Sequence, residues 1–385
     1  MTTKVFSSSQ PGAPVLSGVA GSLIAILDAV LVNGWGAQAV SSIVVSGGIA
    51  TVSFANPHSS MVNGTILIAG ATPAALNGEK RVLTSGAQTL TFSAPGVADG
   101  NASGSITSKV APLGWVKLFS GTNQAAYKST VPESTGCVLA VTDTLAGGAT
   151  VTGYEAMTSV SAGTGRFPTA GQAPTFVWSK SDSTDASSRA WRIIGDERGF
   201  YFSCVPNASA LRASQTMYFG DIQSVKSNDP YACAITGSLA YQNAVTDFAS
   251  SSVEFADGAF ANTSVFLARA ANTLGGSQPV FKEASIMTFT SYRSGQGSLA
   301  YAYPSPVNNG LVLTRMRVAS SPQGVRGYLP GVYLSPQAIG TSLSTDEIVN
   351  GSGELAGTKL LTIGTGTGTF ATSGAVFFDI TNDWR

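Results

Sequence analysis

Residues 41–54 read SSIVVSGGIATVSF, and this stretch decides the fold class. Its two runs, 43–45 and 49–54, are rich in β-branched residues and follow the period of two that is typical of a strand. Between them, Ser46-Gly47-Gly48 supplies the positive φ angles that a tight turn requires. The stretch therefore predicts two strands joined by a short turn.

The same signature continues outward through the first third of the chain. Further strand-like runs, mostly bounded by Gly, Pro, Asn or Ser, occur at 65–68, 81–83, 89–92 and 104–107. Six short strands within about seventy residues are typical of a compact unit. We therefore predict a small β-barrel or β-sandwich over residues 41–111.

Aromatic-rich strands characterise residues 112–238. The clearest hairpin runs from Trp191 to Cys204, where residues 195–199 join two strand-like runs. Because most of the tryptophans lie in this segment, we expect an aromatic-rich β-sandwich with the densest core of the chain. Trp191 and Phe202, on opposite arms of the hairpin, are predicted to lie in that core.

The remaining residues, 239–385, are again strand-like and predict a C-terminal β-rich domain. No internal repeat of fixed period is convincing, which disfavours propellers and solenoids. The predicted fold class is all-β, with several small sandwich or barrel modules in series. An N-terminal arm and one short helix, within residues 1–40, precede them.

That helix is predicted over residues 22–33. Its apolar residues recur at spacings of three and four, Ser17 or Ser22 can cap its start, and Gly34 can close its end. The wide apolar face has two interpretations: the helix lies on a neighbouring sheet, or it docks on a partner protein. Under the second interpretation residues 1–40 contact a neighbouring subunit, and the partner-binding side chains are Leu23, Ile24, Leu27, Val30 and Leu31.

Composition excludes several classes of partner. The 21 basic and 21 acidic residues give a net charge of zero, and the basic ones are dispersed, so no stripe is available for nucleic acid. From the sequence we expect no secretory signal and no membrane span, because residues 1–9 lack a charged segment leading into an apolar one and no apolar stretch reaches the length of a span. Only 11% of the residues are charged, which leaves a surface of small residues that suits a component of an assembly.

Few residues could bind a metal or act as nucleophiles. Cys137, Cys204 and Cys233 are far apart, lack metal-ligand spacing, and are predicted to be buried thiols of a protein made in a reducing cytoplasm. The single histidine, His58, has no acid or thiol near it in sequence and is predicted to lie on the surface. We predict no metal site and no cofactor.

Pairs of acidic residues are the remaining candidates for catalysis, because glycan cleavage needs only two carboxylates. Asp196 and Glu197 fall in the predicted hairpin turn, where polar residues are common. Asp346 and Glu347 fall at a predicted helix start, where acidic residues stabilise the helix. Each position accounts for its acidic residues without a catalytic role. A third, looser pair is Glu254 and Asp257. The sequence therefore predicts no catalytic residues and a protein that is not an enzyme.

Residues 217–222, MYFGDI, followed by KSND at 226–229, are more distinctive. One interpretation is a plain strand and turn. The other is a site for a cation or another ligand in the loop, because clustered carboxylate and amide oxygens suit hard cations.

Several motifs resemble a family of structural proteins of tailed bacteriophages. They are APVLSGVAGSLI at 13–24, LVNGWG at 31–36 and IAGATPAALNGE at 68–79, together with FGDI at 219–222, DPY at 229–231 and LPG at 329–331. The resemblance extends over most of the chain and carries no catalytic residue across.

The resemblance implies a virion component of the tail tip, baseplate or fibre-attachment region. The near alternative is a capsid decoration or head-fibre protein, and the alternative from another class is a carbohydrate-binding adhesin. Expected partners are other virion proteins, further copies of the chain and, for an adhesin, a host surface glycan. An adhesin is expected to expose a cluster of aromatic rings, for which the candidates are Tyr301, Tyr303, Tyr328 and Tyr333.

Overall fold

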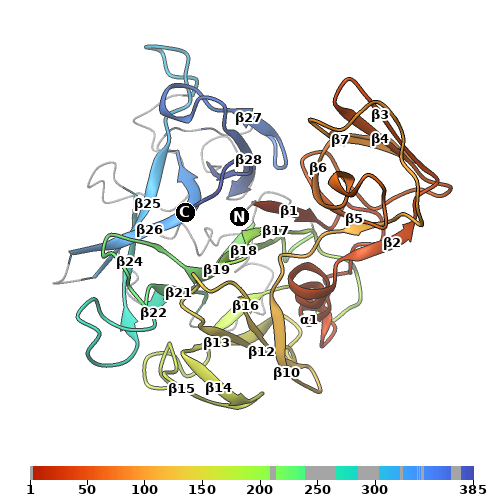
Figure 1. The fold of residues 1–385 in the computed structure, drawn as a ribbon. Helices are drawn as coiled ribbons and strands as arrows, with labels where there is room; N and C mark the ends of the chain where they lie inside the picture. Colours follow the sequence, from red (N-terminus) through yellow and green to blue (C-terminus); the bar gives the residue numbers. More distant parts are fainter. Residues whose placement is uncertain are drawn as a thin grey trace.

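The computed structural model describes residues 3–208, 214–238, 265–284, 303–320, 324–335, 337, 339, 342–365 and 374–385. In these residues the chain forms antiparallel β-sheets and one short helix that continues as a π-helix, so the all-β prediction is confirmed. Figure 1 shows a barrel-like unit beside a larger group of sheets, with the two chain ends close together between them.

The barrel-like unit, residues 35–110, is a curled eight-stranded sheet around a core of its own. Its strands alternate as the sequence predicts: Ile43 and Val45 are buried, whereas Val44 between them is 40% exposed. The strand predicted at 104–107 lies later, at Thr107–Val110. In sheet order the strands are β2 (Trp35–Ala39), β9 (Thr107–Val110), β5 (Thr65–Ala69), β6 (Gly78–Ser85), β7 (Thr89–Ser93), β4 (Ile49–Ser53), β3 (Ser42–Ser46) and β8 (Gly100–Asn101), with the 3-10 turn η2 (Ala74–Leu76) between β5 and β6.

A seven-stranded central sheet is buried on both faces. The predicted hairpin is its centre, with Trp191 paired to Cys204, and both Trp191 and Phe202 are fully buried. Along one strand, Ile193 faces the first core and Ile194 the second. The strand order is β1 (Lys4–Ser7), β17 (Trp191–Asp196), β18 (Gly199–Cys204), β19 (Gln215–Asp221), β21 (Cys233–Thr236), β22 (Val265–Leu267) and β23 (Gln278–Pro279).

A five-stranded sheet and the helix cover one face of the central sheet and enclose the first core. This core is aromatic: Trp178 stacks on Phe202, and Trp115 meets the edge of Phe200. The covering strands are β10 (Val116–Gly121), β11 (Gln124–Lys128), β12 (Val138–Thr142), β13 (Gly148–Tyr154) and β16 (Val177–Ser179), and a separate hairpin joins β14 (Ala156–Ser159) to β15 (Ala162–Thr164).

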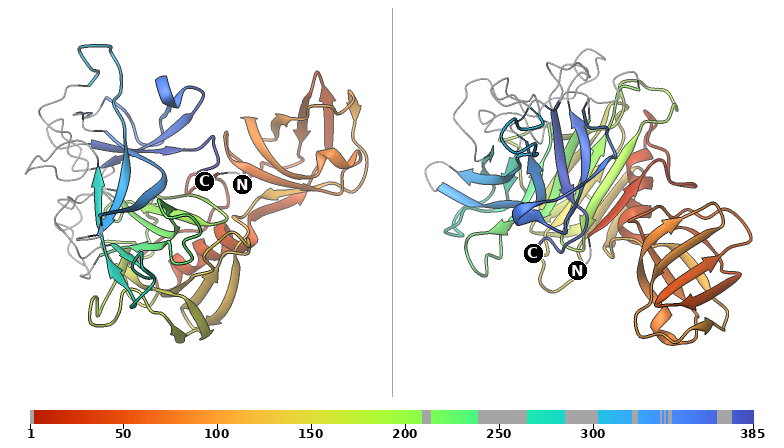
Figure 2. Two further views of the ribbon diagram at one scale, coloured as in Figure 1. Left: turned by 60° about the vertical axis from the view of Figure 1, so that its left-hand side comes forward. Right: turned by 90° about the horizontal axis from the view of Figure 1, so that it is seen from above.

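A C-terminal sheet covers the other face and encloses the second core. Here Tyr201 of the central sheet packs against Phe378 and Trp384 of the C-terminal segment. Figure 2 shows these sheets layered, with the barrel to one side. The strand order is β24 (Phe281–Ala284), β25 (Thr314–Ser320), β26 (Gly324–Leu334), β29 (Gly374–Asp379), β28 (Lys359–Thr365) and β27 (Ile348–Asn350); β20 (Gln223–Ser224) pairs with β26, and η3 (Gly353–Leu355) follows β27.

The predicted helix spans α1 (Ser22–Leu27) and the π-helical segment η1 (Asp28–Asn33). Gly34 ends the helix and its N–H donates to the carbonyl of Ala29, but with φ 67° and ψ −176° it has a positive φ without the left-handed helical conformation of a glycine cap. At the start, neither Ser17 nor Ser22 caps the helix. Instead the carboxylate of Asp143, distant in sequence, accepts hydrogen bonds from the N–H groups of Leu23 and Ile24.

The sheets cross two of the domain boundaries that the sequence suggests. Residues 4–7, expected in an N-terminal arm, form edge strand β1 of the central sheet, where Phe6 is buried. Strands β22 and β23, expected in a C-terminal domain that begins at 239, extend the same sheet. The central and C-terminal parts are therefore built around one shared sheet.

Candidate functional site

The two chain ends are tied to each other and to the barrel. The hydroxyl of Thr3 donates to the carbonyl of Asn382 at 2.7 Å. From β6 of the barrel, the guanidinium of Arg81 donates to the carbonyls of Thr3 and Ile380, both at 2.7 Å. One side chain of the barrel thus holds residues from both ends of the chain.

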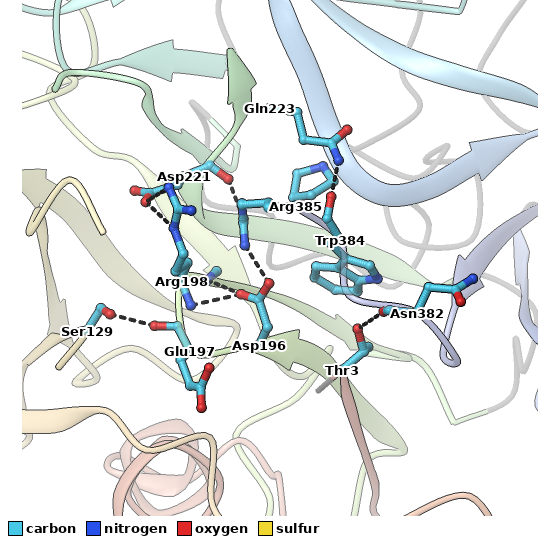
Figure 3. A network of polar contacts seen from close by, with 12 residues as sticks. Thr3, Ser129, Asp196, Glu197, Arg198, Asp221, Gln223, Asn382, Trp384 and Arg385 are labelled. Carbon is cyan, nitrogen blue, oxygen red and sulfur yellow. Dashed lines mark hydrogen bonds and ion pairs between the residues drawn. The ribbon is translucent and has the colours of Figure 1, made fainter. Parts of the chain in front are cut away.

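Next to this junction lies a network of buried ion pairs, drawn in Figure 3. Asp196, at the end of β17, forms an ion pair with Arg385, and both side chains are almost fully buried. The other oxygen of Asp196 accepts the backbone N–H groups of Arg198 and Gly199, at 2.8 and 2.9 Å. Arg385 also donates to the hydroxyl of Tyr218 at 3.0 Å. The sequence predicts Asp196 to be only a polar residue of the hairpin turn. In the structure its ion pair with Arg385 holds the C-terminal residues in place.

Asp221, at the end of β19, organises the second half of the network. Its side chain is 2% exposed and pairs with Arg198 at 3.0 Å. It also accepts hydrogen bonds from the backbone N–H and the hydroxyl of Thr135. One buried carboxylate therefore fixes two side chains that come from separate loops.

Burial and charge shift several pKa values in this region. Burial raises the pKa of the Tyr201 and Tyr218 hydroxyls well above the usual value. Burial would lower the pKa of Arg385, but the neighbouring Tyr218, Asp196 and Asp221 raise it above its usual value. These neighbours therefore favour the charged form of Arg385.

Glu197 sits beside the network but outside it, and Figure 3 shows its carboxylate directed away from Arg198. Burial raises the pKa of this carboxyl, and the positive charge of Lys4 opposes that rise. Within the described part of the chain, Oε2 of Glu197 has no hydrogen-bond partner. Lys4 itself pairs with Glu79 of the barrel.

A pocket of about 690 Å³ is lined by Thr135 and Arg198, the two residues that Asp221 holds. It is bounded by residues 133–135, by the loop 222–230, and by Arg198 and Arg385. This loop contains the KSND segment that the sequence singles out. Among the described residues, no group of three or more His, Cys, Asp or Glu side chains could hold a metal ion.

The five helix residues considered for partner binding lie inside the chain's own first core. Leu23, Leu27, Val30 and Leu31 are fully buried and Ile24 is 8% exposed. Their apolar face packs with the five-stranded and central sheets, which is the first of the two interpretations of this helix. In this structure these side chains present no surface to another protein.

The tyrosines considered for receptor binding do not form an exposed cluster where they are described. Tyr303 and Tyr333 are partly buried against a small core of the C-terminal sheet. Tyr328 is partly buried, with the guanidinium of Arg315 4.1 Å from the centre of its ring. Tyr301 lies outside the described residues, as do Glu254 and Asp257.

Two other expectations are corrected. His58 is 5% exposed and not on the surface, because Nδ1 accepts the N–H of Ser60 and Nε2 donates to the carbonyl of Thr89. Asp346 does not start a helix: it has φ 71°, precedes strand β27 and forms an ion pair with Arg192. The three cysteines are free and buried, as predicted.

Sequence reasoning missed the long-range polar pairs. Besides the network around Asp196 and Asp221, Lys180 and Asp143 form a fully buried ion pair at the start of the helix. No local motif marks such residues, because their partners lie far away in the chain. Within the described residues, no helix is long and apolar enough to span a membrane.

Comparisons with known proteins do not assign this chain to a family. No family model matches it, and no curated protein matches it. Among solved structures it is similar to the one titled "Phage phi92 endosialidase", at 12% identity and a TM-score of 0.17. The match covers 90% of this chain and 52% of that chain, so this chain spans about half the length of the phage protein.

This comparison contradicts one prediction from the sequence. The chain was predicted not to be an enzyme, yet the similar structure is, by its title, an enzyme from a phage. We therefore withdraw that prediction. The endosialidase activity in that title is a property of the phage protein and is not assigned to this chain.

Proposed function

We propose that this chain is a structural component of a tailed-bacteriophage particle, located in the tail tip, baseplate or fibre-attachment region. The sequence motifs that resemble phage structural proteins suggest the particle. The observation that carries the structural role is the junction of Arg81 with Thr3 and Ile380, which ties the barrel to both ends of the chain.

The junction supports this role because a subunit that positions its neighbours needs parts with fixed relative orientation. The central sheet shares a core with the sheets on both sides. The buried pair of Asp196 and Arg385 then fixes the C-terminal residues against that sheet. Such contacts restrict movement between the parts more than a flexible linker would.

The surface chemistry agrees with assembly into a particle. Net charge is zero and charged residues are few, so association with further copies or with other virion proteins meets little electrostatic repulsion. Under this proposal the protein is made in the bacterial cytoplasm and is found in the virion.

The test is immunodetection with antibodies raised against the purified chain. Purified particles should contain the protein, and after separation of heads from tails it should remain with the tails. Recovery with the heads would favour the decoration or head-fibre alternative and overturn the tail assignment. Absence from particles that are otherwise complete would overturn the virion role.

A further inference from the structure

We propose that the pocket beside Asp221 binds an acidic saccharide, with its carboxylate and hydroxyl groups held by side chains of the rim. The volume of about 690 Å³ lies within the range of roughly 300–1,000 Å³ found for small-molecule sites. This proposal does not depend on where the protein sits in a particle.

The rim contains a guanidinium that is fixed before any ligand arrives. Nε and Nη2 of Arg198 both lie 3.0 Å from Oδ2 of the buried Asp221. A guanidinium has five N–H donors, and in the described residues Nη1 of Arg198 makes no hydrogen bond. Its side chain is 21% exposed and lines the pocket, so a preorganised pair of donors is available to a carboxylate.

Residues 226–228, which also line the pocket, supply further donors. The ammonium of Lys226 donates to the carbonyl of Ala271 at 2.9 Å, which leaves two of its three N–H groups. The side chains of Ser227 and Asn228 are exposed and have no hydrogen-bond partner in the part of the chain that is described. Asn228 has φ 51°, in the left-handed region that asparagine adopts more readily than most residues.

The balance of donors and acceptors selects the ligand class. Asp229 is already engaged by Arg326 at 2.8 Å and by the hydroxyl of Ser224, so it offers little to a ligand. Glu133 also lines the pocket and is exposed, so it can accept hydrogen bonds from hydroxyl groups of a ligand. Arg198 and Lys226 can only donate, which favours a ligand that carries a carboxylate as well as hydroxyl groups. The hydroxyl and amide groups of Ser227 and Asn228 can exchange hydrogen bonds with sugar hydroxyls, and an acidic peptide lacks these.

Calorimetric titration of the full chain tests the ligand class with three probes. Trigalacturonic acid carries a carboxylate on each ring, maltotriose is a neutral trisaccharide, and triglutamate is an acidic peptide. Trigalacturonic acid should bind, and its affinity should fall as salt is added because charges are screened. Maltotriose and triglutamate should bind at least about tenfold more weakly, since each lacks one class of contact.

Variants then locate the site. Lys226→Gln and Arg198→Lys should each weaken binding of trigalacturonic acid by about tenfold, and Arg198→Lys keeps a positive charge beside Asp221 so that the fold is preserved. Asn228→Gly removes the amide while retaining the left-handed backbone. Lys109→Gln is the matched control, because Lys109 also donates to one carbonyl, that of Asn33, but lies far from the pocket in the barrel.

Three results would overturn the proposal. No heat of binding with trigalacturonic acid at millimolar concentrations would exclude the ligand class. Equal binding of maltotriose or triglutamate would exclude an acidic saccharide as the preferred ligand. Unchanged binding in both Lys226→Gln and Asn228→Gly, with an unchanged melting temperature, would place the ligand elsewhere. The particle immunodetection experiment stays informative in each case, so failure of one proposal does not imply failure of the other.

Discussion

The barrel and the central sheet differ in how many faces they bury. In β3 of the barrel, Val45 is buried while its neighbour Val44 is 40% exposed. In β17 of the central sheet, the neighbours Ile193 and Ile194 are both fully buried and belong to different cores. The barrel is thus a self-contained unit, whereas the central sheet holds together the layers on either side of it.

This difference determines how far from a core substitution the structure should be destabilised. A cavity in the barrel core removes contacts within one curled sheet. A cavity beside the central sheet removes contacts between two sheets, because that core is shared. The predictions below use this contrast, beginning with the largest effect.

The largest effect is expected for Trp191→Ala. Trp191 is fully buried, and its indole N–H donates to the carbonyl of Pro14 at 2.9 Å. Removing it should lower the free energy of unfolding by roughly 3–5 kcal/mol, as for other buried large aromatic residues. Hydrogen exchange should accelerate in both the central and the five-stranded sheet.

Phe92→Ala is the matched change in the barrel, because Phe92 is 1% exposed in the barrel core. Its effect on exchange should stay within residues 35–110. If Trp191→Ala instead left thermal stability unchanged, Trp191 would not belong to a shared core.

A comparable loss is expected for Lys180→Met. Lys180 and Asp143 are fully buried, so removing one partner leaves an uncompensated charge, which typically costs about 3–5 kcal/mol. Denaturant unfolding measures the loss. The double change with Asp143→Leu should restore part of it, but not all, because Leu23 and Ile24 then lose the acceptor of their N–H groups. Full recovery in the double variant would show that Asp143 does not cap the helix.

A smaller effect is expected for Arg81→Met at the junction. Its guanidinium donates to the carbonyls of Thr3 and Ile380. Hydrogen bonds to charged groups contribute about 1.5–3 kcal/mol. Hydrogen exchange should increase for residues 3–7 and 380–384 and stay unchanged around Phe92. Unchanged exchange at both chain ends would show that Arg81 does not fasten them.

The strands and the helix could be predicted from sequence because their signals are local. The period of two in 43–54 and the spacing of apolar residues in 22–33 both reflect which face of the element is buried. The four residues of β1, 4–7, are too few to carry such a signal. The pairing of Asp196 with Arg385 depends on how distant segments meet, and the composition of either segment does not reveal it.

The smallest effect is expected for Glu197→Gln. Burial raises the pKa of Glu197, so the folded chain binds its proton more tightly than the unfolded chain does. Between the unfolded pKa and the raised folded pKa, this group should therefore make the fold less stable as pH rises. Glu197→Gln should flatten that part of the stability profile and modestly stabilise the protein at pH 7. An unchanged profile from pH 4 to 7 would contradict the assignment.

The most direct test compares neighbouring residues in the two kinds of sheet. Unfolding free energies would be measured for Ile193→Ala and Ile194→Ala in the central sheet, and for Val45→Ala and Val44→Ala in the barrel. A sheet buried on both faces predicts that each isoleucine change costs about 2–5 kcal/mol. In the barrel Val45→Ala should destabilise, whereas Val44→Ala should stay within about 0.5 kcal/mol of the parent. If Ile194→Ala were as silent as Val44→Ala, the central sheet would have one free face and the shared-core account would be wrong.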